Sequence, residues 1–188
     1  AIYALHTNLD SVEGGVNWKI AEKIGLDNVQ VLQPKKNTLS KLVTFVPEDA
    51  SEKVLSELYQ AGAGHIGNYD HCSFQTEGTG TFRPNVNADP AVGTNGKDEA
   101  VKEVRIELLV PTMKMNCVLT QLKKSHPYEE VAYYAGSLNN NNQGVGSGAY
   151  GELQKPMTPK DFIAYLKDAM ALKVIRATRF LQRDISRI

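Results

Sequence analysis

The chain has 188 residues, of which 41% are hydrophobic and 22% are charged. This composition is typical of a globular chain long enough for one domain, or for one domain with part of another. The 21 basic side chains balance the 21 acidic ones, so charge gives no support to binding of nucleic acid or of an acidic membrane. No apolar run approaches the about 20 residues of a membrane span. The two cysteines, Cys72 and Cys117, lack a paired spacing, which favours free thiols in a reducing cytoplasm.

A short apolar run at residues 2–5 predicts a buried strand, and three polar side chains follow it: His6, Asn8 and Asp10. Alternation along an extended chain would place all three on one face. An imidazole with a carboxylate at the end of a strand is typical of a metal site or of an acid–base pair. The alternative is a turn in which Asn8 and Asp10 bond to the backbone.

The next elements follow from apolar spacing and from turn residues. The pattern predicts a helix at 16–24 that ends at Gly25, a linker at 27–40, a strand at 42–46, a helix from 47 to Gly62, strands at 65–74 and 78–82, a polar loop at 84–99, a strand at 102–110, a helix at 111–126 and a strand at 131–137. The order over residues 42–137 is typical of the split β-α-β pattern of a ferredoxin-like sandwich.

The Asn/Gly-rich segment 139–151 predicts a linker. A phosphate-binding loop is the less favoured alternative, because the Lys-Ser/Thr of a P-loop is missing. A helix follows at 156–172, with Thr158 as its N-cap and Pro159 in its first turn. The pattern then predicts a strand at 174–177 and the start of another within 181–188.

A second group of side chains could also supply ligands to a metal. Its members are His126, Glu129 and Glu130, together with His65, His71 and Cys72. The favoured alternative is that His126 and Glu129 lie at a helix end and pair with neighbouring groups. The aromatic side chains of this region are predicted to be packing residues; they are Tyr69, Phe74, Phe82, Tyr128, Tyr133 and Tyr134.

Several motifs, in one order along nearly the whole chain, carry a family resemblance. They are HTNLD at 6–10, GGVN at 14–17, AEKIGL at 21–26, GAGHIGNY at 62–69, CSF at 72–74, GTGTFRP at 78–84, HPYEEVAY at 126–133 and GEL at 151–153. With them the chain resembles the Nif-three-like family, whose members are often labelled GTP cyclohydrolase 1 type 2 homologues.

The resemblance implies an α+β or α/β protein in which a ferredoxin-like lid domain is inserted into a main domain. The inserted domain would span residues 39–145, and residues 1–38 and 146–188 would be parts of the Nif-three-like α/β main domain. The family implies a paired-histidine motif upstream and a His…Glu pair downstream, and neither is in this sequence. We therefore expect the chain to be a central fragment of a longer protein.

The resemblance also implies a site and a reaction. In the family, the aspartate that matches Asp10 is a ligand of a two-metal centre, so we expect Asp10 to bind a divalent metal ion such as zinc, manganese or iron. His6 lies beside it as a nearby polar group and is the candidate catalytic residue. Paired metals activate water, and the family label suggests hydrolytic opening of a purine nucleotide ring. Most of the metal ligands that the family implies are missing from this sequence. We therefore expect this fragment to be inactive, and it could have no metal bound.

The competing expectation is a non-catalytic module that senses a metal or a small ligand and acts through assembly. In either case we expect a homo-oligomer in the cytoplasm, a dimer or a trimer, because unpaired sheet edges favour association. The expected partners are other copies of the chain and a small-molecule nucleotide substrate, with no nucleic acid and no membrane.

Overall fold

The computed structural model describes residues 2, 4, 6–142, 144–180 and 182–188. The chain divides into two compact units. Unit 1 combines residues 1–35 with residues 141–188, and unit 2 consists of residues 36–140. Among the helices of the described residues, none is long and apolar enough to cross a membrane.

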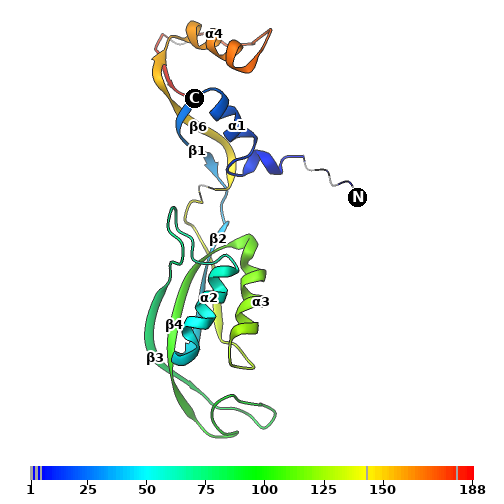
Figure 1. Ribbon diagram of the computed structural model, residues 1–188, viewed down its shortest axis with the longest axis vertical. Coiled ribbons are helices and arrows are strands. Elements are labelled where there is room, and N and C mark those ends of the chain that lie inside the picture. Colours follow the sequence, from blue (N-terminus) through cyan, green and yellow to red (C-terminus); the bar gives the residue numbers. More distant parts are fainter. Residues whose placement is uncertain (1, 3, 5, 143, 181) are drawn as a thin grey trace. The chain divides into compact units, whose positions relative to one another are not determined.

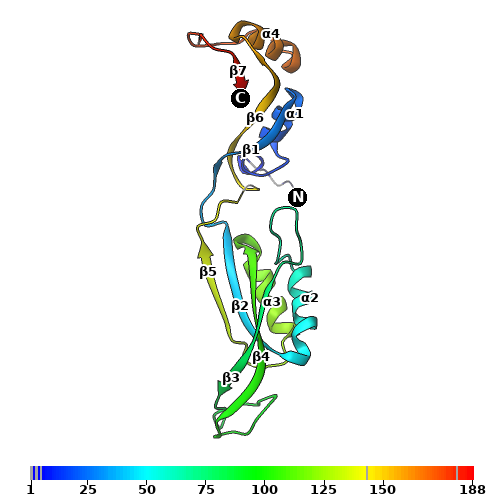
Figure 2. The same cartoon turned by 90° about the vertical axis from the view of Figure 1, so that its left-hand side faces the viewer.

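Unit 2 contains a four-stranded sheet with two helices packed on one face, which Figures 1 and 2 show from two sides. Its elements in chain order are β2 (Leu39–Pro47), η2 (Glu48–Ala50), α2 (Ser51–Gln60), β3 (Phe74–Phe82), β4 (Glu99–Pro111), η3 (Thr112–Lys114), α3 (Met115–Ser125) and β5 (Tyr133–Leu138). The strand order is β3-β4-β2-β5, and every neighbouring pair is antiparallel. The strands predicted at 42–46, 102–110 and 131–137 and the two predicted helices of this region are confirmed.

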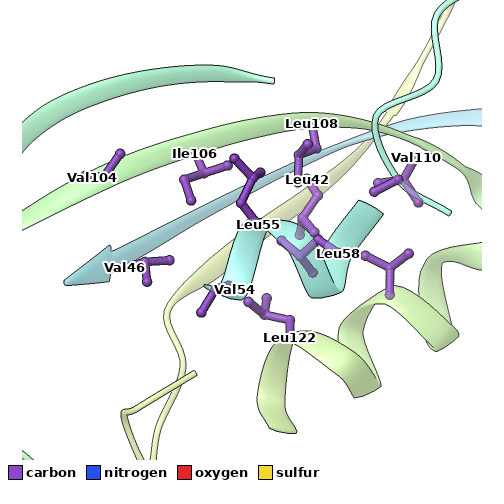
Figure 3. Packing of buried hydrophobic residues seen from close by; sticks show 12 residues of the cluster. Leu42, Val46, Val54, Leu55, Leu58, Val104, Ile106, Leu108, Val110 and Leu122 are labelled. Atoms are coloured by element: carbon purple, nitrogen blue, oxygen red, sulfur yellow. The ribbon is translucent and has the colours of Figure 1, made fainter. Parts of the chain in front are cut away.

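Alternation along the strands explains why the helices cover one face of this sheet. The side chains at even positions of β2 and β4, such as Leu42 and Ile106, are fully buried and pack against α2 and α3. The helices contribute Leu58, Val118 and Leu122, which recur at helical spacing and are also fully buried. Figure 3 shows Leu42 of β2 and Leu58 of α2 in this core. Burial of each such side chain contributes about 1.5–3 kcal/mol to folding.

The hairpin of β3 and β4 runs past the end of β2. The pairing of β4 with β2 ends at Glu103, which lies opposite Pro47, whereas its pairing with β3 continues to Glu99. Residues 79–82 and 99–102 therefore form a two-stranded overhang, visible in Figure 1 below the ends of the helices. The strap, residues 83–98, connects the two strands of this overhang.

Unit 1 contains a three-stranded antiparallel sheet of order β1-β6-β7. Its elements in chain order are η1 (Asn8–Ser11), α1 (Val16–Lys23), β1 (Leu26–Pro34), β6 (Gly146–Met157), α4 (Pro159–Met170) and β7 (Ile185–Arg187). The predicted helices at 16–24 and 156–172 are confirmed. Gly25 ends α1 with a φ of 64°, and the side chain of Thr158 accepts a hydrogen bond of 3.2 Å from the main-chain N–H of Asp161.

Two segments that were expected to be linkers are strands instead. Residues 27–40 contain most of β1, and residues 139–151 contain the first half of β6. The two strands pair with each other in an antiparallel register, with Val31 opposite Ala149. Gly146 allows the close approach, because a side chain there would place its Cβ 2.3 Å from the carbonyl oxygen of Gln33. Gly146, one of the glycines that suggested a flexible linker, is therefore required by tight strand packing.

Two predicted strands are wrong. Residues 65–73 form an irregular loop that contains an isolated bridge between Ile66 and Tyr69, and β3 begins only at Phe74. Gly67 and His71 have φ values of 58° and 55° in this loop, and such a backbone does not continue a strand. Residues 174–177 have no regular structure, whereas the strand expected within 181–188 is present as β7. All strand pairs among the described residues are antiparallel, so the protein is α+β and the α/β alternative is not observed there.

Candidate functional site

The first candidate site, around His6 and Asp10, does not have the predicted geometry. Of the strand expected at 2–5, Tyr3 and Leu5 lie outside the described residues. Asn8 and Asp10 belong to the 3-10 helix η1, so the alternation that was expected to place His6, Asn8 and Asp10 on one face of an extended chain is wrong. The main-chain N–H of Asp10 donates to the carbonyl of Thr7 at 3.2 Å, which is a turn of the backbone itself and involves neither polar side chain.

The side chains of His6 and Asp10 are both exposed. The amide of Asn17, on α1, donates a hydrogen bond of 2.7 Å to the carbonyl oxygen of Asp10, which fixes the backbone of η1 against the helix. Within the described part of the chain, no three His, Cys, Asp or Glu side chains gather closely enough to hold a metal ion. Because a metal centre needs three or four ligands, these residues do not fit a two-metal centre by themselves.

The second group of expected ligands is not brought together either. His126 follows α3 and is buried, and both of its ring nitrogens are occupied. Nε2 donates to the carbonyl oxygen of Phe45 at 2.9 Å, and Nδ1 accepts from the main-chain N–H of Tyr128 at 3.0 Å. Because a carbonyl can only accept and an amide N–H can only donate, these bonds require one neutral tautomer. The structural interpretation of His126 is therefore confirmed.

The other members of this group have separate positions. Glu129 is exposed and accepts a hydrogen bond of 2.9 Å from the main-chain N–H of Asp89. The ring of His71 stacks on Tyr59, with centroids 4.5 Å apart and planes within 8°. Cys72 lies beside it, where its main-chain N–H donates to Gly64 and its thiol donates to the carbonyl of Asp70 at 3.6 Å. These contacts hold the irregular loop at 65–73 in place.

The burial of His126 predicts a dependence of stability on pH. Burial lowers the pKa of its imidazole, against the smaller opposing effects of the Phe45 carbonyl and of the charge on Glu103. An unfolded histidine takes up a proton near pH 6.5, so below that pH the unfolded chain binds more protons than the folded one. We therefore expect the free energy of unfolding of unit 2 to fall as pH drops from 7.5 to 5.5.

Urea titrations at pH 7.5, 6.5 and 5.5 check this expectation. The fall should shrink in His126→Gln and persist in His65→Gln, which changes an exposed side chain. Carboxylates with lowered pKa values, such as that of Glu107, titrate below this range and do not contribute. An unchanged pH profile in His126→Gln would contradict the expectation.

A cavity of about 640 Å³ lies in unit 2, at the overhang of the β3–β4 hairpin. The hairpin, the strap and residues 128–132, which precede β5, border it, together with Phe45 of β2 and Tyr134 of β5. The sheet face that turns toward it is the one that the helices leave open, since odd positions of β2 and β4 point there. Of the side chains considered as metal ligands, Glu129 and Glu130 line this cavity, whereas His6, Asp10 and the other members of the second group do not.

Aromatic rings from four different segments line the cavity. Phe45 of β2 and Tyr134 of β5 meet edge to face, with centroids 5.7 Å apart and planes at 81°. The ring of Phe82, at the end of β3, has its centroid 6.2 Å from that of Tyr128, and the two ring planes meet at 54°. The sequence predicted that Phe82, Tyr128 and Tyr134 are packing residues, but here they also face an empty space.

Glycines of β3 provide room on one side of the cavity. Gly78 and Gly80 lie on the open face of the sheet, and Gly78 is the cross-strand partner of Glu103. A Cβ built on Gly78 would meet no atom within 4 Å, whereas one on Gly80 would lie 2.0 Å from a carboxylate oxygen of Glu103. The side chain of Glu103 therefore lies across β3 at Gly80. Two alternating glycines in a strand are the one signal in the sequence that could have indicated this space.

The strap is fixed at both ends and in the middle. Arg83 and Asp98 join its ends through an ion pair, with Nε and Oδ1 2.6 Å apart, and the N–H of Gly96 donates to the carbonyl of Pro84 at 2.8 Å. Between these contacts, the bond from Asp89 to Glu129 ties the strap to the segment before β5. The strap is thus held in a defined position, in which it forms one side of the cavity.

Tyr128 carries an unusual polar group at this site. Its hydroxyl oxygen is buried and has no hydrogen-bond partner among the described residues. Burial raises the pKa of the phenol to about 12, and the neighbouring carboxylate of Glu103 adds to the shift without meeting it in hydrogen-bond geometry. The phenol is therefore neutral at physiological pH and keeps a proton that it can donate.

The fold and these motifs agree with a comparison against known families. The sequence profile of the family Duf34/NIF3 (NGG1p interacting factor 3) matches residues 1–188. The chain therefore belongs to the Duf34/NIF3 family, as the motifs predicted.

Curated relatives share the name "GTP cyclohydrolase 1 type 2 homolog". The protein of that name from Halalkalibacterium halodurans is 42% identical over 188 residues, which are 100% of this chain and 50% of the relative. The one from Bacillus subtilis is 42% identical over 177 residues, 94% of this chain and 48% of the relative. A crystal structure of a Bacillus cereus protein related to NIF3 matches with a TM-score of 0.82 and 41% identity, over 97% of this chain and 48% of that one. The chain spans about half the length of the curated relatives it matches.

Proposed function

We propose that unit 2 is a binding module for a small organic molecule within a longer protein of the Duf34/NIF3 family. The observation that carries this proposal is the aromatic-lined cavity of about 640 Å³. Ligand pockets in proteins measure about 300–1,000 Å³ and combine apolar walls with a few polar groups. The rings of Phe45, Phe82 and Tyr134 supply such walls, and the charged side chains of Glu103 and Arg105 supply polar groups at the border.

In this proposal unit 2 is the ferredoxin-like lid domain inserted into the main domain, with 39–145 as the expected bounds. Its support is the order of elements, strand, helix, strand, strand, helix, strand, with β2 and β4 as the central strands of the sheet. The cavity then lies on the open face of this domain and beyond the end of β2, where a ligand can enter without disturbing the core.

A pair of glycine substitutions tests whether the cavity binds a ligand. In Gly78→Val the new side chain enters the cavity, whereas in Gly136→Val it enters open space on β5, outside the cavity. Both glycines lie in strands where valine is favoured, so both variants should fold. We expect 2-naphthol, a neutral aromatic probe, to shift the amide resonances of residues 76–82 in the unchanged chain and in Gly136→Val, and to bind about tenfold more weakly to Gly78→Val.

Two results of this titration would contradict the proposal. One is the absence of any shift at residues 76–82 and 128–134 with 2-naphthol and with every other small organic probe titrated to millimolar concentration. The other is equal binding to Gly78→Val and Gly136→Val, which would place the probe elsewhere.

A second function concerns unit 1. We propose that Asp10 is one ligand of a two-metal centre whose remaining ligands come from outside this chain, with His6 as the nearby polar group. The supporting observation is the exposed carboxylate of Asp10 on a backbone that Asn17 fixes. The name of the relatives suggests a nucleotide such as GTP as substrate. Zinc, manganese or iron is the metal that the family resemblance implies.

This second proposal predicts that residues 1–188 alone do not turn over GTP. Because the described residues do not supply the three or four ligands of a metal centre, added zinc or manganese should give no turnover above the buffer. The measurement is release of product from GTP with each metal, with Asp10→Ala as the control. Turnover that Asp10→Ala abolishes would contradict the prediction.

A further inference from the structure

The charges around the cavity are unevenly balanced. Its border includes four carboxylates and two guanidinium groups; they belong to Glu77, Glu103, Glu129, Glu130, Arg83 and Arg105. Each guanidinium already has a carboxylate partner outside the lining. Arg83 forms an ion pair with Asp98, and Nη2 of Arg105 lies 2.6 Å from Oε1 of Glu107. Asp98 offsets the charge of Arg83, and Arg105 shares the carboxylate of Glu107 with Lys41. Among the described residues, none of the four carboxylates of the border forms an ion pair.

Glu103 lies among the aromatic rings of this border. Its side chain crosses β3 at Gly80, it is half-buried, and its charge acts on the hydroxyl of Tyr128. The ring of Tyr128 in turn faces that of Phe82. A carboxylate beside aromatic rings in one cavity can attract a cation in two ways, through its own charge and through the negative faces of the rings.

We infer that the cavity binds an organic cation, with an ammonium group held by Glu103 and by the aromatic rings around it. This inference rests on the proposed ligand-binding function of unit 2 and names the chemical class of the ligand. A bare metal ion does not fit, since no three ligating side chains gather among the described residues. An anionic ligand does not fit the border either, because Arg83 and Arg105 are already paired.

Three isosteric probes separate charge from shape. Choline carries a quaternary ammonium, 3,3-dimethyl-1-butanol replaces its nitrogen by carbon, and 3,3-dimethylbutanoate carries a carboxylate on the same tert-butyl group. We expect choline to shift the amide resonances of residues 76–82 and to bind about tenfold more tightly than the alcohol. The butanoate should bind most weakly.

Two variants test the groups that are named. Glu103→Gln keeps the shape of the side chain and removes its charge. Choline should therefore lose most of its higher affinity relative to the alcohol, while the affinity for the alcohol stays the same. Glu52→Gln removes an equal charge from α2, away from the cavity, and should change neither. Tyr134→Leu, at an exposed position, removes a ring and should also weaken choline more than the alcohol.

The outcomes distinguish the inference from the function on which it rests. If 2-naphthol or the alcohol binds at residues 76–82 but choline binds no more tightly, or if the butanoate binds best, the cavity is a ligand site and the inference of a cation is wrong. If none of the four probes shifts these residues, the proposed function fails as well. If Glu103→Gln and Glu52→Gln weaken choline equally, the effect is one of overall charge and the role of Glu103 is refuted.

Discussion

Leu58→Ala should lower the free energy of unfolding of unit 2 by about 3 kcal/mol. Leu58 lies on α2, is fully buried, and packs in the cluster that joins both helices to β2 and β4. Truncation removes three carbon atoms from a site surrounded on all sides, and such a core keeps most of the resulting void because it relaxes only in part. The measurement is urea unfolding followed by amide hydrogen exchange at Ile106 and Val110, which reports on unit 2.

Met113→Ala is the matched control for this prediction. Met113 lies in η3 of the same unit but is 86% exposed, so its truncation should cost less than about 0.5 kcal/mol. Equal losses in the two variants, or a loss below about 1 kcal/mol for Leu58→Ala, would contradict the packing of α2 against the sheet.

His126→Ala should destabilise unit 2 by a similar amount, about 3 kcal/mol, although it removes no apolar group. The histidine joins β2 to the segment before β5, through the carbonyl of Phe45 and the N–H of Tyr128. Without the ring, both main-chain groups lose their partner, and each buried polar group left unpaired costs about 1–3 kcal/mol. Urea unfolding at pH 7.5 measures the loss.

His65→Ala provides the comparison, because His65 is exposed in the irregular loop and should change stability by less than about 0.5 kcal/mol. The His126 variant should also loosen residues 128–132 and thereby one wall of the cavity, which faster amide exchange there would reveal. A stability equal to that of His65→Ala would mean that the two hydrogen bonds contribute nothing.

The sequence predicted those elements whose signals are local. The helices at 16–24, 47–62, 111–126 and 156–172 have apolar residues at helical spacing and a residue that ends or caps them. The strand β4 alternates buried and exposed side chains over most of its length, which is equally visible in the sequence. The family was also predictable, because its motifs are contiguous in the sequence.

The strands β1 and β6 could not be predicted, because each is stabilised by a partner far away in the sequence. Leu26 pairs with Leu153, and of the nine residues of β1 only Val31 is buried. Polar and turn-forming residues around Asn28 and Pro34 therefore resembled a linker. The cavity was missed for the same reason: Phe45, Phe82 and Tyr134 line one cavity only because of the strand order of the sheet, whereas they are 37 and 52 positions apart in the sequence.

The places where the chain passes between the two units have a consequence for how such a protein could arise. Leu39 and Leu138, next to the ends of unit 2, are cross-strand partners, and Pro34 and Gly146, next to the break in unit 1, are cross-strand partners as well. Each unit therefore brings its own two connecting ends side by side. A single insertion of coding sequence into a β-hairpin loop could add unit 2 without altering either sheet, and a short turn from Pro34 to Gly146 could restore the hairpin after its removal.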